Sequence, residues 1–262
     1  MRILQYSYMI RAMLVGGIVS VIVPMIGLVV VNKRAAMIGD ALSHVSLAGV
    51  MIGLILGFNP IVGAICICIV AGLGLDFFNK RFSGYEEVST AIVMSSGIGL
   101  ASILSGFVKG SANLESFLFG SIIAISDFEL WMILSIAAVV IFLMWRYYYS
   151  LLHICFDEVS AELLGISAQS MNRIFMILTA TTIALSARTV GVLIISSLMV
   201  LPVTCAMRCR CSYHKTLILA ICFALFFTLG GLVLAFYLGL KPGGTIVMLG
   251  VLTLISLIIV KK

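Results

Sequence analysis

Long apolar stretches that alternate with short polar breaks dominate the pattern of this chain. Nine such stretches can be traced, at about residues 12–31, 35–57, 61–78, 88–107, 128–145, 174–187, 190–207, 216–239 and 244–260. The breaks contain charged residues or residues that favour turns, as in Asn32-Lys33-Arg34 and Gly57-Phe58-Asn59-Pro60. Because about 20 apolar residues in a helix span a bilayer, the pattern predicts an all-α polytopic membrane protein with about nine transmembrane helices.

The composition excludes a soluble enzyme. Hydrophobic residues make up 63% of the 262 residues and charged residues only 10%, with a mean hydropathy of +1.27. Soluble domains are about 45–50% apolar and about 25% charged. Nine spans leave only short connections, so we expect residues 1–262 to form a single transmembrane domain in the cytoplasmic membrane, without a soluble catalytic domain.

The basic residues predict the orientation of the chain, because Lys and Arg collect in connections on the cytoplasmic side of a membrane. Eleven of them fall in alternate connections and at the C-terminus: Lys33, Arg34, Lys80, Arg81, Arg146, Arg173, Arg208, Arg210, Lys215, Lys261 and Lys262. The other five lie on the opposite side: Arg2, Arg11, Lys109, Arg188 and Lys241. We therefore expect the N-terminus outside and the C-terminus in the cytoplasm. Phe117–Ser126 is too short to cross, and an interfacial or a re-entrant piece there would change the count of nine.

The net charge of +6 reflects this asymmetry and does not indicate a nucleic-acid partner. The seven cysteines do not predict disulfides either. Four of them lie in apolar runs and three near basic connections that we place in the cytoplasm, where thiols stay reduced.

The most specific chemical signal lies in the second stretch, in Gly39-Asp40-Ala41-Leu42-Ser43-His44. Asp40 and His44 are four residues apart, so they share one face of a helix. Ionisable side chains in a membrane segment are costly and are expected to face a pathway or a partner. A carboxylate oxygen and an imidazole nitrogen are also half of a ligand set for a divalent transition metal. The alternative is a simple hydrogen bond between the two side chains, neutralised by Lys33 and Arg34.

A short amphipathic helix is predicted at about residues 156–166, within the longest polar connection. Acidic residues lead the segment (Asp157, Glu158), Ala161 follows, and Gly165 stops it. Two interpretations remain open at this point. The segment is either a solvated linker helix or a docking helix that inserts into a groove of a partner.

The other ionisable residues predict little chemistry. We expect Asp76 to pair with Lys80 or to be solvated, and His153 and His214 to be solvated. Surface positions are expected for Glu115, Asp127 and Glu129. Cysteine and histidine cluster at Cys205, Cys209, Cys211 and His214, but their spacing matches no standard zinc framework, so a metal site at Cys209, Cys211 and His214 is only a weak candidate.

Two catalytic motifs do not occur in the sequence. There is no H-E-x-x-H motif, so a zinc intramembrane peptidase is unsupported. There is no G-x-x-x-x-G-K-[ST] motif, so the chain does not hydrolyse ATP through a P-loop. The function class that remains best supported is the passage of a small solute, a cation above all.

In order along the chain, three stretches resemble the permease subunits of zinc- and manganese-type metal-ion ABC transporters. They are Met37-Ile38-Gly39-Asp40-Ala41-Leu42-Ser43-His44 after a basic pair, then Val190-Gly191-Val192-Leu193-Ile194-Ile195-Ser196-Ser197-Leu198-Met199-Val200-Leu201-Pro202, and finally Leu240-Lys241-Pro242-Gly243-Gly244-Thr245-Ile246-Val247. The likeness extends over essentially the whole chain.

The resemblance implies a homodimeric permease that works with two cytoplasmic ATPase subunits and an extracytoplasmic metal-binding protein. It implies that Asp40 and His44 line the metal path, and that Asp157–Gly165 is the segment coupled to the ATPase. That segment matches the E-A-A-x-x-x-G importer loop only loosely, because its first two positions differ. No permanently bound cofactor is implied: the divalent metal is cargo, and ATP acts only through the partner subunit.

In a symmetric dimer, Asp40 and His44 of both subunits can meet near the two-fold axis. Two nitrogens and two oxygens suit tetrahedral Zn²⁺, whereas Mn²⁺ prefers more oxygen ligands, so zinc is favoured over manganese. Two other function classes remain open. One is a self-sufficient proton-coupled carrier in which Asp40 and His44 relay protons, and the other is a membrane scaffold that transports nothing.

Overall fold

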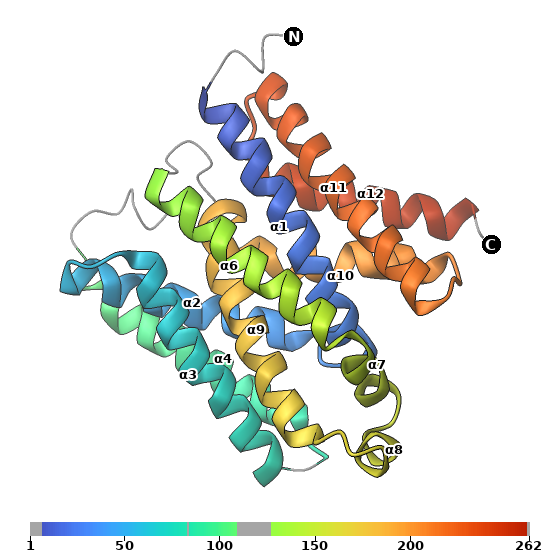
Figure 1. The fold of residues 1–262 in the computed structure, drawn as a ribbon. Coiled ribbons are helices and arrows are strands. Elements are labelled where there is room, and N and C mark those ends of the chain that lie inside the picture. The colour runs from blue at the N-terminus through green and yellow to red at the C-terminus, as the bar shows by residue number, and fades with distance from the viewer. Residues whose placement is uncertain (1–6, 83, 109–126, 261–262) are drawn as a thin grey trace.

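The structure is a computed structural model that describes residues 7–82, 84–108 and 127–260. Phe117–Ser126 and Glu115 therefore lie outside the described residues. Within the described ranges, all regular secondary structure is helical (Figure 1). The helices are α1 (Ser7–Asn32), α2 (Met37–Leu56), α3 (Pro60–Arg81), α4 (Glu86–Ser105), α6 (Asp127–Arg146), α7 (Tyr148–Phe156), α8 (Glu158–Leu163), α9 (Ala168–Val190), α10 (Val192–Arg208), α11 (Tyr213–Leu238) and α12 (Pro242–Val260).

Each of the nine apolar stretches coincides with one long helix. Seven of these helices are long and apolar enough to cross a membrane, namely α1, α2, α3, α4, α6, α11 and α12. The other two are α9, whose first turns carry polar residues, and α10, which has 17 residues. The prediction of an all-helical polytopic membrane protein is confirmed, while the count of nine crossings and the orientation of the termini stay predictions.

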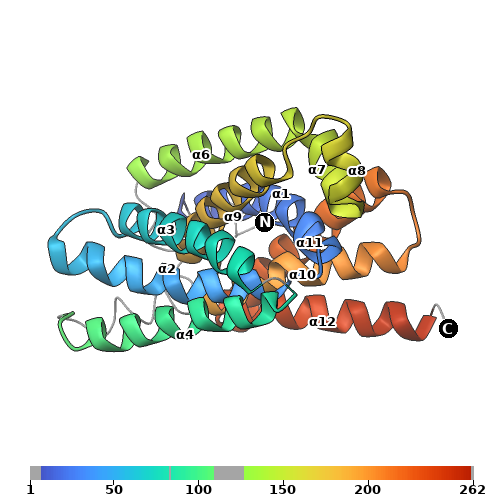
Figure 2. The ribbon, with the colours of Figure 1, turned by 90° about the horizontal axis from the view of Figure 1, so that it is seen from below.

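The helices form two groups that meet along α10 and α9. In one group α2 packs against α3 and α4, and α9 packs against α3. In the other, α1, α10, α11 and α12 pack together, and α10 also contacts α2. Figure 2 shows α6 along one edge of the molecule and α4 and α12 along the opposite edge. This arrangement places α2 and α10, which carry the motifs of interest, side by side in the interior.

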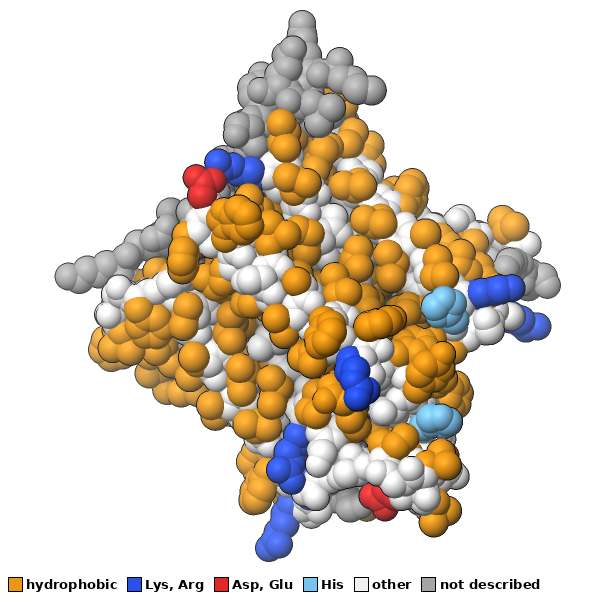
Figure 3. Space-filling model, viewed as in Figure 1, with side chains coloured by type: hydrophobic (Ala, Val, Ile, Leu, Met, Phe, Trp, Pro, Cys, Tyr) orange, Lys and Arg blue, Asp and Glu red, His pale blue; other side chains and the backbone are white. Residues whose placement is uncertain are grey.

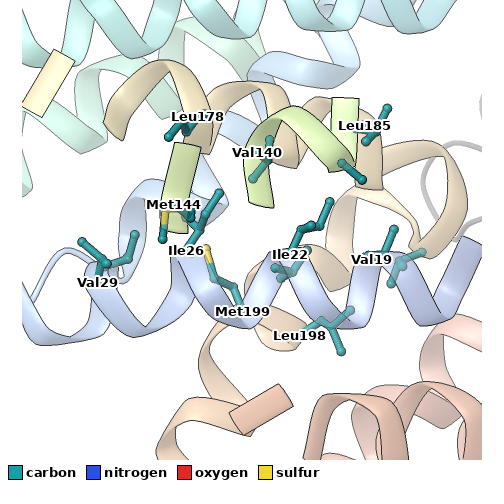
Figure 4. Packing of buried hydrophobic residues seen from close by; sticks show 14 of the residues in the cluster. Val19, Ile22, Ile26, Val29, Val140, Met144, Leu178, Leu185, Leu198 and Met199 are labelled. Atoms are coloured by element: carbon teal, nitrogen blue, oxygen red, sulfur yellow. The ribbon is translucent and has the colours of Figure 1, made fainter. Parts of the chain in front are cut away.

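The degree of burial separates central helices from peripheral ones. In the most apolar window of each helix, 72% of α2 and 67% of α1 is buried, against 17% of α12. Figure 4 shows Val19, Ile22, Ile26 and Val29 of α1 facing side chains of α6, α9 and α10. The outer faces are apolar as well, and hydrophobic side chains cover most of the face seen in Figure 3. An apolar exterior around an apolar core is what a chain surrounded by lipid requires.

Two ion pairs join residues that the charge pattern places on the same side of the membrane. Lys33 Nζ lies 2.9 Å from Glu158 Oε1, and both belong to the predicted cytoplasmic side. Arg11 Nη2 lies 2.7 Å from Asp127 Oδ1, and both belong to the predicted outer side. The helices therefore keep these two sets at separate ends of the bundle.

Glu129 corrects one expectation. It was expected at the surface, but it is buried, with 5% of its surface exposed. The reason is its position on α6: Glu129 begins the inward stripe that continues through Ile133, Ala137 and Val140. Asp127, by contrast, is exposed as expected.

Candidate functional site

The candidate site lies on α2. This helix begins directly after the turn that holds Lys33 and Arg34, and it ends at Gly57, whose φ of 74° suits a glycine at a helix C-terminus. Asp40 lies in the first turn of α2. The peptide dipoles at a helix N-terminus favour a carboxylate there, so this position lowers the cost of a charge close to the membrane.

Asp40 and His44 interrupt an otherwise buried segment. From Ile38 to Met51 every residue of α2 is buried except these two, which are partly exposed. They are one helical turn apart, so their side chains are exposed on the same side of α2. The predicted shared face is confirmed, and it is the one place where the described part of this segment is open to its surroundings.

The alternative of a simple internal hydrogen bond finds no support in the geometry. Among the described residues, the side chains of Asp40 and His44 have no hydrogen-bond or ion-pair partner. Lys33 is engaged elsewhere, with Glu158 at 2.9 Å and with Asn172 at 2.7 Å. The polar side chain between them, Ser43, donates its hydroxyl to the carbonyl oxygen of Gly39 at 2.7 Å. The carboxylate of Asp40 and the imidazole of His44 are therefore available to bind a ligand.

The two most specific stretches of the sequence pack on each other. A Cβ atom at Gly39 would collide with Cε of Met199 and would lie 3.7 Å from Cα of Ser196. Met199 and Ser196 belong to α10, within the stretch that ends at Pro202. On α10 the partly exposed residues include Ser196, Ser197, Val200 and Thr204. The absence of a side chain at residue 39 thus lets α10 approach α2 beside Asp40.

The segment predicted at about residues 156–166 contains a short helix, α8 (Glu158–Leu163), at the end of the molecule where α7 also lies, and Phe156 belongs to the end of α7 (Figure 1). Asp157 accepts a hydrogen bond from Ser160 at its start. Gly165 ends it with a φ of 80°, and Ile166 N donates to the carbonyl oxygen of Ala161 at 3.0 Å. The prediction of a short helix with a glycine stop is confirmed.

Large apolar side chains are exposed around this short helix, whereas a solvated linker would expose mainly polar ones. Ala161 faces inward and is fully buried, whereas Leu163 is 85% exposed and Leu164 is 66% exposed. Phe156, just before α8, is 70% exposed. Three large apolar side chains around one short polar helix favour the docking interpretation over the solvated linker.

Cys209, Cys211 and His214 are not assembled into a metal site in this chain. Among the described residues, no three His, Cys, Asp or Glu side chains lie close enough to hold an ion together. The thiols of Cys209 and Cys211 point to nearby backbone carbonyl oxygens, and His214 Nδ1 lies 3.5 Å from the Tyr148 hydroxyl.

The remaining ionisable residues follow the expectations. Asp76 Oδ2 accepts a hydrogen bond from Lys80 Nζ at 2.7 Å, and His153 and His214 are exposed.

One group was not anticipated from the sequence: Lys33, Glu158 and Asn172 hydrogen-bond to one another, although they come from three separate parts of the chain.

Comparison with known proteins identifies the family of this chain. A family model described as "ABC 3 transport family" matches residues 5–261. The chain belongs to this family. The match covers nearly the whole sequence, so it confirms the resemblance to permease subunits of metal-ion ABC transporters that rested on three stretches.

Individual relatives of this ABC 3 family chain are named for several metals. A "Probable metal transport system membrane protein" of Treponema pallidum is 33% identical over 257 residues, which cover 97% of this chain and 96% of the relative. The "Manganese transport system membrane protein MntC" of Listeria monocytogenes is 28% identical, over 94% of this chain and 88% of the relative. The "High-affinity zinc uptake system membrane protein ZnuB" of Haemophilus influenzae is also 28% identical, over 93% and 94%.

Solved structures share the fold of this ABC 3 family chain. A chain in the structure titled "PsaBC from Streptococcus pneumoniae in complex with Fab" superposes with a TM-score of 0.86 and 24% identity, covering 99% of this chain and 92% of the other. A "putative metal-chelate type ABC transporter" in an inward-facing conformation superposes with a TM-score of 0.74 and 17% identity, covering 95% and 85%. At these identities the likeness establishes the arrangement of helices.

Proposed function

We propose that this chain is the membrane-spanning permease subunit of an ATP-driven importer of a divalent transition metal. The observation that carries the proposal is the partial exposure of Asp40 and His44 on one face of α2, within a segment whose other residues are buried. A carboxylate and an imidazole that have no side-chain partner among the described residues, on one face of a central helix, are suited to bind a passing cation. Membership of a transport family supports the same conclusion.

The proposal includes a homodimer in which the two copies of α2 face each other. Asp40 and His44 of each copy then supply two oxygens and two nitrogens close to the two-fold axis. This donor set suits tetrahedral Zn²⁺ better than Mn²⁺, which prefers an oxygen-rich six-coordinate shell. The names of the relatives do not choose the metal, because they include manganese and zinc transport proteins. The chemistry of the two side chains is therefore the argument for zinc.

Energy comes from outside the chain in this proposal. The sequence has no P-loop motif, so ATP hydrolysis belongs to a separate cytoplasmic subunit. That subunit docks on the exposed apolar side chains Leu163 and Leu164 of the α8 segment. An extracytoplasmic metal-binding protein delivers the ion at the opposite end of the bundle.

The test is metal uptake into vesicles that contain the chain, its ATPase subunit and its binding protein, with Zn²⁺ and Mn²⁺ in competition. The chain has three histidines, which provide matched variants. We expect Asp40→Asn and His44→Gln to abolish uptake while the protein still reaches the membrane, and His153→Gln and His214→Gln to leave uptake near the wild-type level. Loss of uptake only in His214→Gln would move the metal path to the cysteine cluster, and unchanged uptake in Asp40→Asn and His44→Gln would refute the assignment of ligands.

The same vesicles separate this proposal from a secondary carrier. Uptake that needs ATP and both partners supports the importer. Uptake by the chain alone, driven by a pH gradient, would instead support a proton-coupled carrier that uses Asp40 and His44 as a relay.

A further inference from the structure

One hydrogen-bonded group joins three elements at the cytoplasmic end. Lys33 lies in the turn between α1 and α2, Glu158 is the first residue of α8, and Asn172 lies near the start of α9. Lys33 Nζ donates to Glu158 Oε1 at 2.9 Å and to Asn172 Oδ1 at 2.7 Å. Asn172 Nδ2 also donates to Glu158 Oε1, at 3.2 Å. Each side chain therefore bonds to both others, and this group is called the Lys33 link below.

The Lys33 link is charged at neutral pH. Partial burial disfavours the Glu158 carboxylate, but the hydrogen bonds from Lys33 and Asn172 and the positive charge of Lys33 outweigh that cost and lower the pKa of Glu158. The Lys33 side chain is 19% exposed and the Glu158 side chain is 52% exposed, so water screens the pair from the Glu158 side. The hydrogen bonds that both side chains form with Asn172 hold the pair in one geometry, which makes it a more effective connection than a lone exposed pair.

The Lys33 link lines a cavity of about 820 Å³, and the lining also includes Asp76 and Lys80 of α3. The main contacts of α8 are with α7 and α9. The cavity separates α8 from α3, so the polar side chains of the link carry the connection from α8 to the α1–α2 turn.

The α1–α2 turn is a short segment closed by backbone hydrogen bonds. Lys33 N donates to Val29 O at 2.9 Å, Ala35 N donates to Val30 O at 2.9 Å, and Ile38 N donates to Ala35 O at 3.0 Å. Arg34 adopts a φ of 58°, which bends the chain sharply between the two helices. Because the turn is closed by its own hydrogen bonds, Lys33 is joined through a short, hydrogen-bonded segment to the start of α2, where Asp40 lies.

We propose that the Lys33 link transmits the displacement of α8 to α2, so that Lys33 and Glu158 are positioning residues that couple ATP hydrolysis to opening of the metal path at Asp40. This inference rests on the proposed function, in which α8 docks on the ATPase. It adds the route by which a movement at the docking helix reaches the metal-binding face.

The first experiment measures the number of metal ions transported per ATP hydrolysed by the complete reconstituted complex. Lys33→Met and Glu158→Gln remove one charge each with little change of size. We expect both variants to assemble and to hydrolyse ATP, with a transport ratio reduced at least about fivefold, the lower end of typical coupling between sites. The charge-exchange variant Lys33→Glu/Glu158→Lys should recover part of the ratio that Lys33→Glu alone loses.

Lys80→Met is the matched control. Lys80 lines the same cavity and forms an ion pair at 2.7 Å with Asp76 of α3, and Asp76 also lies 4.0 Å from Arg173 of α9, so this group connects α3 to α9 but reaches neither α8 nor the α1–α2 turn. Its removal should leave the transport ratio unchanged. A normal ratio in Lys33→Met and Glu158→Gln, or an equal loss in Lys80→Met, would overturn the proposal.

A second experiment tests the Lys33 link without transport. Amide hydrogen exchange is measured on the purified full-length chain, and the proposal requires Glu158→Gln to increase exchange in both residues 33–38 and residues 157–163, whereas Lys80→Met does not. An increase confined to residues 157–163 would overturn the link. If the wild-type complex transports no metal, the proposed function fails, and the exchange result still decides whether the two elements are connected.

Discussion

Gly39 of α2 lies directly against the terminal methyl group of Met199 of α10. Met199 is buried, with 1% of its surface exposed. A second glycine, Gly27 of α1, approaches Met199 at its backbone, where an added Cβ would collide with the carbonyl oxygen. Helix α10 is thus held between α1 and α2 by two close approaches that only small residues permit. The position of α10 beside Asp40 follows from this packing.

Gly27→Ala should destabilise the bundle. The added methyl group meets the backbone of Met199, which cannot rotate away as a side chain can. Overpacking of this kind costs about 1–3 kcal/mol, more than the gain of up to about 1 kcal/mol that alanine brings to a helix. The expected result is a lower apparent Tm in detergent, measured by size-exclusion chromatography after heating.

Gly17→Ala is the control for that measurement. It lies in the same helix, and a Cβ at this position meets nothing within 4 Å. Its Tm should equal or exceed that of the wild type, because alanine favours the helix and no contact is disturbed. Equal Tm values for Gly27→Ala and the wild type would show that α1 and α10 are not in backbone contact.

Leu163→Ser/Leu164→Ser should weaken the attachment of the ATPase subunit. Burying one leucine side chain contributes about 1.5–3 kcal/mol, so removing two should reduce the affinity at least about tenfold. Co-purification of the two subunits measures the loss. Leu240→Ser is the matched control, since Leu240 is also exposed but lies in the connection between α11 and α12. Attachment that survives Leu163→Ser/Leu164→Ser would remove the α8 segment from the docking surface.

Gly165→Val should disturb the end of α8 through the backbone alone. Gly165 has a φ of 80°, and a Cβ there would meet nothing within 4 Å, so the cost arises from the left-handed conformation. That conformation costs a non-glycine residue about 1–2 kcal/mol, and asparagine tolerates it better. We expect metal uptake to fall in Gly165→Val and to stay close to the wild-type level in Gly165→Asn. Equal uptake in both would mean that the glycine stop is not needed for coupling.

The apolar pattern predicted where the helices lie but contained no information on which of them are neighbours. The stretch expected at 244–260 is helix Pro242–Val260, and the stretch expected at 216–239 is helix Tyr213–Leu238. The largest difference is α9, which runs from Ala168 to Val190 instead of 174–187, because its polar first turns face the cavity beside the Lys33 link. Lipid-facing and core-facing residues are equally apolar in a membrane, so hydropathy does not tell which helices touch.

For the site, the spacing of residues within one segment predicted their arrangement, but the pairing of residues far apart in the sequence could not be predicted. The interval of four residues predicted that Asp40 and His44 share a face, and the glycine at position 165 predicted the end of α8. The pairing of Lys33 with Glu158 could not be predicted, because the two residues are 125 positions apart and no periodic pattern connects them. The burial of Glu129 was missed for a related reason: a charged residue next to a connection is normally solvated, and only its place on the inward stripe of α6 shows otherwise.

Cys155 provides a chemical probe of the cavity next to the Lys33 link. Burial raises the pKa of this thiol to about 11, with Lys33 acting to lower it and Glu158 acting to raise it. Only the thiolate reacts with iodoacetamide, so the labelling rate of Cys155 should rise about tenfold for each pH unit from 7 to 10. An ordinary thiol, with a pKa of about 8.5, stops accelerating near pH 9. Peptide-resolved mass spectrometry follows each cysteine separately, and the exposed Cys211 serves as the internal comparison. A rate at Cys155 that levels off near pH 9 would show that water reaches this side chain freely and that its burial does not raise the pKa of the thiol.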